Sequence, residues 1–257
     1  MYNPKIAIIM PTIDNDDVLM DSIESIIDNI DMNIYKIIII DQNHPDTYST
    51  RKRIFYETAA SNWHDRENQK IRVIPLGYNC GSAYARNEGI KIASRERIPY
   101  ILMTNDNIRF NKSMSKLEEL TSYVYRYDVL GLSINDYSHK VGKIDLIHND
   151  RFHFVAIRTK KCTSCYKKKV IFNVDIVDNF YLTRTSLYDK LRYDNSLKTY
   201  EKEDFFIRLK WNKYTVGFTK FCNGDYIVSP ESNVKKQNLI DGKQRLKEKY
   251  NLRDKND

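Results

Sequence analysis

The sequence predicts an α/β protein in which helices flank a mostly parallel sheet and the carboxyl-terminal half is rich in strands. Through the first 110 residues, continuous β-branched runs alternate with segments of helical periodicity. Such continuous apolar runs are typical of strands that helices bury on both faces. Beyond residue 110 the pattern is less regular. Because 257 residues suffice for one large core, we expect one domain with parts at 1–110, 111–234 and 235–257, the first two sharing one sheet.

The amino-terminal part predicts four strands separated by three helices. The strands are the apolar runs at residues 5–10, 35–41, 70–75 and 100–104. The first helix follows the acidic residues 14–17, whose charge complements a helix dipole, and its apolar positions recur at helical spacing from Leu19 to Ile30. Pro45 is expected to open the second helix, and Ser82 is expected to cap the third.

The carboxyl-terminal part predicts fewer regular elements. Residues 151–159 and 168–177 are expected to form the two arms of a long hairpin. Its tip would carry Cys162 and Cys165, a single C-x-x-C pair that falls short of the four ligands of a structural zinc site. The other expected elements are helices at 114–124, 201–211 and 235–250 and strands at 179–184, 215–218 and 226–229.

Charge and cysteine content bound the partners and the compartment. The 42 Lys and Arg against 34 Asp and Glu give a net charge of +8, which favours anionic partners. Acidic residues interrupt the basic ones along the chain, which argues against a nucleic-acid-binding face. Four cysteines are too few for a disulfide framework, and no apolar run approaches the ~20 residues that cross a bilayer. We therefore expect a cytoplasmic protein without a membrane span. Peripheral contact with a membrane surface is compatible with this expectation.

Several polar residues directly follow the predicted strands. In open α/β sheets, ligands bind outside the carboxyl ends of the strands. The residues at these ends are Pro11, Thr12, Asp41, the turn from Gly77 through Asn79 to Gly81, and the triplet Thr104, Asn105 and Asp106. Glycine lets backbone approach a ligand closely, and the helix that follows Gly81 offers its amino terminus to phosphate. Structural alternatives are that Pro11 only ends a strand and that Asp41 only caps the next turn.

Four ordered segments, IAIIMPT, IIIIDQN, GYNCGSAYARNEGI and YILMTNDNIRF, resemble family 2 glycosyltransferases of the GT-A fold, whose nucleotide-binding half is Rossmann-like. The resemblance implies a uridine diphosphate (UDP) sugar as donor. It places Pro11 and Thr12 beside uracil and ribose, Asp41 on the imide N–H of uracil, and Arg86 beside the diphosphate. The implied nucleotide-sugar-binding residues are Pro11, Thr12, Asp41, Gly77, Asn79, Gly81, Arg86, Asn105 and Asp106.

The resemblance also implies a divalent metal, but with an incomplete motif. Family members carry an acidic D-x-D triplet that holds Mn²⁺ or Mg²⁺ on the diphosphate, because hard cations prefer oxygen ligands. Here the triplet begins with Thr104, so only Asp106 is carried over as a metal ligand. A late histidine of many such enzymes is replaced by Ser229 and Pro230. A weakly held metal and a metal-independent mechanism, with Arg86 as a source of positive charge, both stay open.

Residues 178–211 are similar to the acceptor-side segment of inverting GT-A enzymes, notably β-1,4-N-acetylgalactosaminyltransferases. An inverting transferase needs a carboxylate that takes the proton of the acceptor hydroxyl. The resemblance assigns this role to Glu203 and Asp204, with Asp204 as the base and Glu201 as the substitute. The structural alternative is that these acids only complement the dipole of their helix, worth ~0.3–1 kcal/mol.

Together these observations predict a glycosyltransferase of polysaccharide biosynthesis that moves a sugar from a UDP-sugar to a glycan or lipid-linked acceptor. The alternative is a nucleotide-sugar-binding protein that has lost catalysis, for which Thr104 is the argument. A nucleic-acid-binding protein is the weaker rival. Sugar nucleotidyltransferases are excluded because they open with a glycine-rich, basic turn, whereas the first strand is followed here by PTIDNDD.

Overall fold

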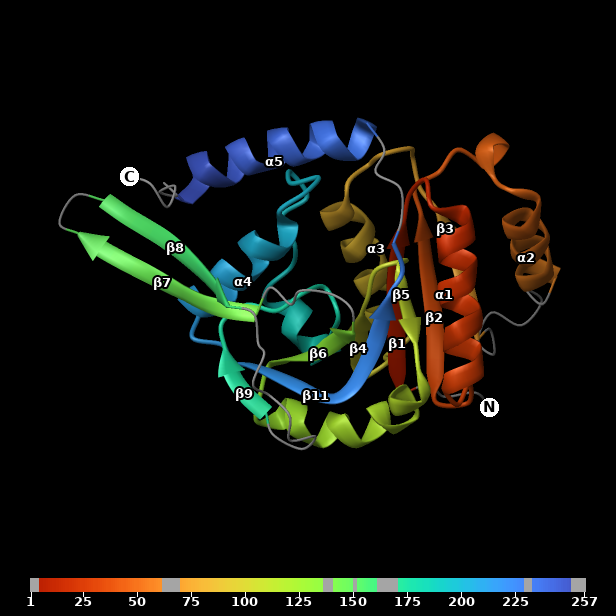
Figure 1. The fold of residues 1–257 in the computed structure, drawn as a ribbon, viewed down its shortest axis with the longest axis horizontal. Coiled ribbons are helices and arrows are strands. Elements are labelled where there is room, and N and C mark those ends of the chain that lie inside the picture. The colour runs from red at the N-terminus through yellow and green to blue at the C-terminus, as the bar shows by residue number, and fades with distance from the viewer. Residues whose placement is uncertain are drawn as a thin grey trace.

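The computed structural model describes residues 5–61, 70–135, 141–149, 152–160, 171–228 and 233–250. Within these residues the chain folds around one large, curled sheet with helices on both faces (Figure 1). The strand order is β3-β2-β1-β4-β10-β6-β11-β5, and β9 pairs with β11. The predicted α/β class with a mostly parallel amino-terminal half is confirmed.

Four parallel strands form the amino-terminal half of the sheet. They are β1 (Ile6–Thr12), β2 (Tyr35–Asp41), β3 (Ile71–Pro75) and β4 (Tyr100–Met103). Every residue of β1 and β2 is buried, as their continuous apolar runs predict. The helices between them are α1 (Asp16–Asn29), α2 (Thr50–Ser61) and α3 (Ser82–Arg95). The βαβαβαβ order is therefore confirmed.

Alternate residues of the strands point to two separate cores. Ile6 and Ile8 pack with α1 and with η2 (Lys112–Tyr125), whereas Ala7 and Ile9 pack with α3 and with α4 (Glu201–Trp211). Helix α3 lies very close to the sheet at Gly89, where a Cβ atom would stand 2.5 Å from Ile9 Cγ2. The sheet thus holds α1 on one face and α3 with α4 on the other.

The carboxyl-terminal half extends the same sheet. Strand β10 (Tyr181–Arg184) runs antiparallel between β4 and β6 (Val129–Asn135). Strand β11 (Val216–Tyr226) pairs in parallel with β6 and antiparallel with β5 (Ile108–Phe110) and β9 (Ile171–Val174). The expectation that both halves share one sheet is confirmed by this continuous pairing.

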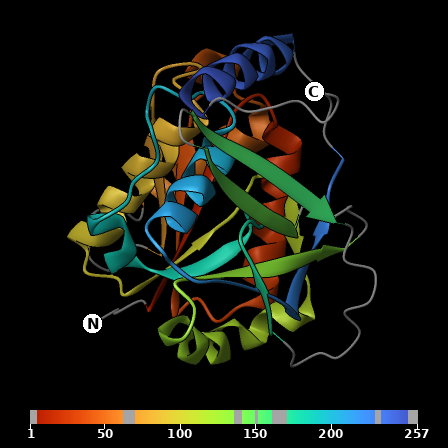
Figure 2. The ribbon, with the colours of Figure 1, turned by 90° about the vertical axis from the view of Figure 1, so that its left-hand side faces the viewer.

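The predicted hairpin has different arms. Strand β7 (Val141–Asn149) pairs with β8 (Phe152–Lys160), and β9 joins the main sheet instead. Two residues connect β7 to β8, and so short a connection costs less loop-closure entropy than the longer one that we expected between residues 159 and 168. The hairpin projects from the end of the molecule opposite α2 (Figures 1 and 2). Cys162 and Cys165 lie outside the described residues, as do Ser229 and Pro230.

Three helix predictions need correction. Helix α2 begins at Thr50, because Pro45 opens a separate 3₁₀ turn, η1 (Pro45–Thr47). The segment around Met114 is a 3₁₀-helix, consistent with Met114, Leu117 and Leu120 recurring every three residues. The N-cap residue of α3 is Gly81, with φ of +101°, whereas the sequence predicts Ser82 at that position.

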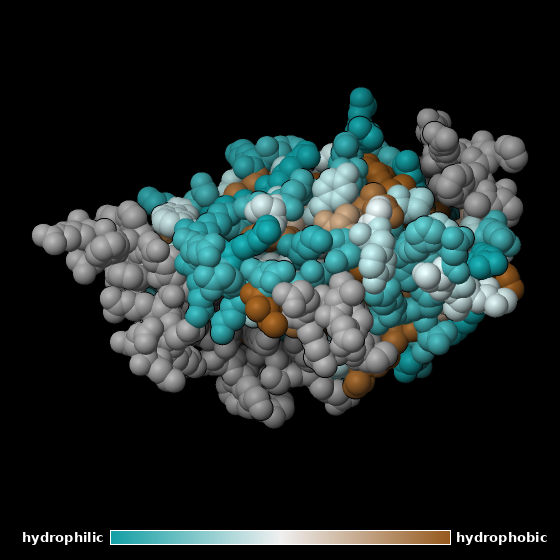
Figure 3. Space-filling model, turned by 90° about the horizontal axis from the view of Figure 1, so that it is seen from above, coloured by the Kyte–Doolittle hydropathy of each residue, from teal (hydrophilic) through white to brown (hydrophobic). Residues whose placement is uncertain are grey.

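The basic carboxyl-terminal helix is α5 (Asn233–Tyr250). It crosses the top of the molecule above α3 and α4 (Figure 1). The face of the molecule seen from that side is mostly hydrophilic, with small and separate hydrophobic areas (Figure 3). Leu246 and Tyr250 are nevertheless buried, so one side of α5 belongs to the core shared with α3 and α4.

Candidate functional site

The carboxyl ends of the parallel strands bring the predicted residues to one edge of the sheet. Thr12 ends β1 and lies directly opposite Asp41, which ends β2. Asp106 follows β4, the neighbour of β1 on its other side. The two central carboxylates therefore flank the end of β1, where the topology of the sheet favours ligand binding.

Hydrogen bonds hold Asp106 in one position. Thr12 Oγ1 donates to Asp106 Oδ2 at 2.8 Å, and Asn15 Nδ2 donates to the same oxygen at 3.2 Å. Ser22 Oγ donates to the main-chain oxygen of Asp106 at 2.6 Å. The aspartate is 8% exposed. Sequence reasoning had assigned no role to Asn15, because a lone asparagine ahead of a helix ordinarily indicates a cap.

Arg86 connects the triplet after β4 to α4. The side chain is 3% exposed, and its Nη2 donates to Asn105 Oδ1 at 2.7 Å. Its Nη1 donates to the Thr104 carbonyl at 3.3 Å, and its Nε to Glu201 Oε1 at 3.4 Å. Burial alone lowers the pKa of this guanidinium, but Tyr193 and Glu201 raise it by more, so Arg86 stays charged. Because Glu201 balances that charge, Arg86 contributes little net positive charge to the site.

Asp41 is fully buried and engaged within the protein. Its Oδ2 lies 2.8 Å from both Lys52 Nζ and Tyr56 OH, and its Oδ1 accepts the N–H of Asn43 at 2.9 Å. Lys52, itself buried, also pairs with Asp16 at 2.8 Å. Burial and the charge of Asp41 raise the pKa of Tyr56 well above 10, so the Tyr56 hydroxyl stays protonated and donates its hydrogen bond to Asp41. The hydrogen bond from Asn43 N–H agrees with the structural alternative that Asp41 caps the next turn. The contact of Asp41 with uracil stays a prediction.

The glycine-bounded turn is tied to the second half of the chain. Gly81 N–H donates to Gln42 Oε1 at 2.9 Å, and Ser82 N–H donates to the Lys198 carbonyl at 3.2 Å. These bonds occupy the N–H of the residue before α3 and the first N–H of the helix, two of the groups that are expected to face a phosphate. Asn79 Oδ1 accepts a hydrogen bond from Asn238 of α5 at 2.8 Å. Gly77 has open space where a Cβ would be.

Asp204 faces α5. The carboxylate is 0% exposed, and its Oδ2 accepts from Arg208 Nε at 2.8 Å and from Nη2 at 2.6 Å. Its Oδ1 lies 2.7 Å from both Tyr250 OH and Lys249 Nζ. Burial and the hydrogen bond to Asp204 raise the pKa of Tyr250, which therefore stays a donor. The structure thus encloses the predicted base between α4 and α5.

The other two acids of the α4 start point in different directions. Glu201 is 6% exposed, and its Oε1 accepts from Asn179 Nδ2 at 3.2 Å as well as from Arg86. Glu203 is paired with Lys202 at 3.7 Å. Two residues along an α-helix turn by about 200°, so Glu203 points away from the Arg86 side. Of the three acids, Glu201 is the one in contact with the residues around Asp106.

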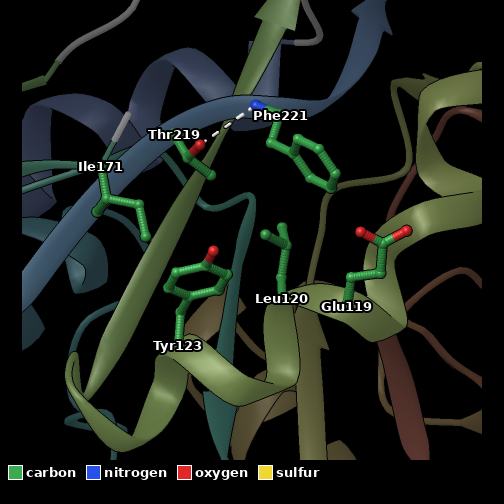
Figure 4. A pocket seen from close by; sticks show the side chains of 6 residues that line it. All are labelled: Glu119, Leu120, Tyr123, Ile171, Thr219 and Phe221. Carbon is green, nitrogen blue, oxygen red and sulfur yellow. Dashed lines mark hydrogen bonds between the residues drawn. The ribbon is translucent and has the colours of Figure 1, made fainter. Parts of the chain in front are cut away.

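A pocket of about 50 Å³ lies between η2 and β11 (Figure 4). It is lined by Glu119, Leu120, Tyr123, Ile171, Thr219 and Phe221. Its volume is far below the ~300–1,000 Å³ of ligand pockets, and none of the predicted site residues lines it. In the described part of the chain, no group of three His, Cys, Asp or Glu residues could hold a metal, and no helix is long and apolar enough to cross a membrane.

The fold is that of a GT-A glycosyltransferase. The family model "Glycosyl transferase family 2" matches residues 7–191, and the chain belongs to this family. None of the curated proteins matches the chain.

Solved structures share the fold at low sequence identity. One is TarS 1–349 of S. aureus in complex with UDP, with a TM-score of 0.56, 15% identity and coverage of 95% of this chain and 72% of that chain. The same protein with UDP-GlcNAc gives a TM-score of 0.58, 14% identity and coverage of 90% and 60%. GalNAc-T7 with UDP, GalNAc and Mn²⁺ gives a TM-score of 0.65, 11% identity and coverage of 94% and 48%.

Proposed function

We propose that this protein transfers a sugar from a UDP-sugar to a hydroxyl of a glycan or lipid-linked acceptor. Family membership supports glycosyl transfer, and the complexes of TarS with UDP and UDP-GlcNAc support the uridine nucleotide. The observation that carries the proposal is the placement of Asp106 at the edge of the sheet, next to Asn105, which Arg86 joins to Glu201 of α4. A donor site and an acceptor-side acid thereby meet.

The donor would lie across the ends of β1, β2 and β4. Pro11 and Thr12 are proposed to contact uracil and ribose, together with Asp41 once its neighbours Lys52 and Tyr56 make room. The turn at Gly77, Asn79 and Gly81 would border the nucleotide, and Asn105 with Asp106 the diphosphate. A cytoplasmic location likewise remains a proposal from the cysteine content.

The residues at Asp106 fit a divalent cation such as Mn²⁺ or Mg²⁺. Asp106 contributes carboxylate oxygens, and the side-chain oxygen of Asn15 is buried beside it without a hydrogen-bond partner. Oxygen donors of this kind suit hard cations. When bound, such a cation would offset the negative charge on the departing UDP. The chain's own contribution is to hold Asp106 still through Thr12 and Ser22.

We propose inversion at the anomeric carbon, with a base from the first turn of α4. The acceptor oxygen would bond to the anomeric carbon as the bond to UDP breaks, and the hydroxyl proton would pass to a carboxylate. The motif assigns Asp204, but its oxygens already accept from Arg208, Tyr250 and Lys249. Glu201 lies beside Arg86, and its Oε2 has no hydrogen bond among the described residues. We therefore propose Glu201 as the general base that takes the acceptor proton. Asp204 is assigned a structural role, in which it binds α5 to α4 through Tyr250 and Lys249.

Nucleotide binding tests the proposed function without knowledge of the acceptor. Thermal unfolding would be followed with UDP, GDP and ADP, each with and without Mn²⁺. Ligand that binds only the native state at a hundredfold excess over Kd stabilises it by about 2.7 kcal/mol. Of the three nucleotides, we expect UDP to stabilise the protein and GDP and ADP not to do so. An equal response to GDP or ADP would refute the uracil assignment, and a UDP response without any sugar transfer would favour the catalytically impaired alternative.

A further inference from the structure

We infer that Asn15 supplies, through its side-chain oxygen Oδ1, a second protein ligand to the divalent cation held by Asp106. This oxygen would replace the first carboxylate of the D-x-D triplet, which Thr104 lacks. The inference rests on the proposed function, because the cation belongs to the complex with UDP. Three observations on Asn15 carry it.

The first observation is the direction of the Asn15 amide. Its Nδ2 lies 3.2 Å from Asp106 Oδ2, the oxygen that also accepts from Thr12. A carboxylate only accepts hydrogen bonds, so the NH₂ group of the amide must face Asp106 and the assignment of oxygen and nitrogen is fixed. Oδ1 is bonded to the same carbon as Nδ2 and therefore belongs to the amide group that contacts Asp106.

The second observation is that Oδ1 has no partner. Asn15 is 7% exposed, and within the described residues Oδ1 is a buried oxygen without a hydrogen bond. Buried polar atoms in native proteins are nearly always satisfied, so an orphaned one calls for an explanation such as an ion. An amide oxygen beside a carboxylate is a combination that Mg²⁺, Mn²⁺ and Ca²⁺ accept.

The third observation is that Asn15 does not perform the usual task of its position. It stands at the N-cap of α1, where asparagine is favoured because its oxygen accepts an N–H of the first helical turn. Asn15 makes no such bond. Its side chain instead turns toward Asp106, 91 residues further along the chain.

The charge of this pair suits a cation that arrives with its substrate. A neutral amide in place of a carboxylate leaves the protein with one negative charge at the ion. We therefore expect weak binding of the bare cation and much tighter binding once the diphosphate of UDP adds its oxygens and its charge.

Binding of Mn²⁺ in the presence of UDP tests the inference, with electron paramagnetic resonance as the readout. Asn15→Leu removes the oxygen at similar volume, and Asn15→Asp replaces the amide with a carboxylate. Ser22→Ala is the matched control, because it removes a hydrogen bond to the main-chain oxygen of Asp106 without touching Asn15 or the proposed nucleotide contacts. The number of waters on Mn²⁺, counted in ¹⁷O-labelled water, separates a ligand from a residue that only positions Asp106.

We expect Asn15→Leu to bind Mn²⁺ at least tenfold more weakly and to hold one additional water on the ion. Asn15→Asp should bind Mn²⁺ at least tenfold more tightly. Ser22→Ala should keep the water count of the parent. An unchanged water count in Asn15→Leu, or weaker binding in Asn15→Asp, would overturn the inference.

Two controls keep this outcome separate from the proposed function. Thermal unfolding shows whether each variant is folded, and Asn15→Asp decides the question by itself if Asn15→Leu does not fold. Failure of the parent to bind UDP would refute the proposed function. Parent binding of UDP with Mn²⁺, combined with unchanged variants, would refute only the role of Asn15.

Discussion

Arg86 Nε and Glu201 Oε1 lie 3.4 Å apart in the interior of the molecule, in an ion pair that joins α3 of the nucleotide side to α4 of the acceptor side. Both side chains are almost completely buried. A buried pair costs desolvation free energy and is seldom favourable for stability alone, so its position beside the Thr104–Asp106 triplet points to a functional role.

Glu201→Gln should therefore reduce sugar transfer in a protein that still folds and binds UDP, with a lower free energy of unfolding because buried Arg86 loses its charge partner. Loss of a general base typically lowers the rate ~10²–10⁴-fold, whereas the amide keeps most of the shape and hydrogen bonding. Turnover would be measured with saturating UDP-sugar, and UDP binding by calorimetry. Near-normal turnover in Glu201→Gln, combined with a folded but inactive Asp204→Asn, would return the base to Asp204.

Asp204→Asn should act mainly on stability. The substitution removes the charge that holds Arg208 and Lys249 and leaves the hydroxyl of Tyr250 with a weaker acceptor. Because these two cations are partly exposed, we expect a loss of about 1–3 kcal/mol in the free energy of unfolding. Urea denaturation would measure it. Glu203→Gln is the control. Among the described residues Glu203 pairs with Lys202 alone, at 3.7 Å, so its loss should change the free energy of unfolding by ~0.5 kcal/mol or less.

Lys52→Met should destabilise the protein strongly. Lys52 Nζ lies 2.8 Å from Asp41 and from Asp16, and neither Lys52 nor Asp41 is exposed. Removal of one partner leaves an uncompensated buried charge, for which ~3–5 kcal/mol is typical. The free energy of unfolding would be compared with that of Arg51→Met, whose exposed pairs with Asp21 and Glu24 contribute little. Equal losses in the two variants would show that Asp41 is not held by Lys52.

The Asp194 carboxyl should make stability depend on acid pH. Burial would raise its pKa, but hydrogen bonds from Lys249 and Ser196 outweigh burial and lower it to about 2 from 3.8. A lowered pKa in the folded state means that this stabilisation is complete above pH ~4 and is lost as the pH falls toward 2. After allowance for partial exposure we expect about 1–2 kcal/mol.

Unfolding of the parent and of Asp194→Asn would be compared at pH 7 and at pH 2.5. The variant should be less stable at pH 7. The difference should shrink at pH 2.5, because the Asp194 carboxyl of the unfolded parent is then protonated and its lowered pKa in the folded state contributes less to stability. A difference that stays constant between the two pH values would contradict this role of Asp194.

Local sequence patterns predicted the parallel strands well, because continuous runs such as residues 35–41 can be buried only inside a covered sheet. The hairpin was assigned the wrong arms because β9 is as apolar as β8, and only the pairing partner β11, far along the chain, distinguishes them. The residues that surround the acids of α4 could not be predicted either, because they lie far away along the chain. Nothing near Asp204 in sequence indicates that Tyr250 will cover it.

The same limit applies to single polar residues. The sequence placed Asp106 at the sheet edge through its position after a strand, and the structure finds it beside Thr12 as the parallel pairing requires. Asn15 carried no pattern of its own. Its orphaned oxygen becomes visible only when Asp106 is brought next to it.

The central claim is sugar transfer from a uridine nucleotide, and UDP release from a panel of nucleotide sugars tests it most directly. The protein would be incubated with Mn²⁺ and UDP-, GDP- and ADP-linked sugars, with and without mixed glycan acceptors, and nucleoside diphosphate would be quantified by chromatography. We predict release of UDP from at least one UDP-sugar, none of GDP or ADP, and at least a hundredfold less UDP from Glu201→Gln. Release from GDP- or ADP-sugars, or no release from any donor by a folded protein that binds UDP, would contradict the account.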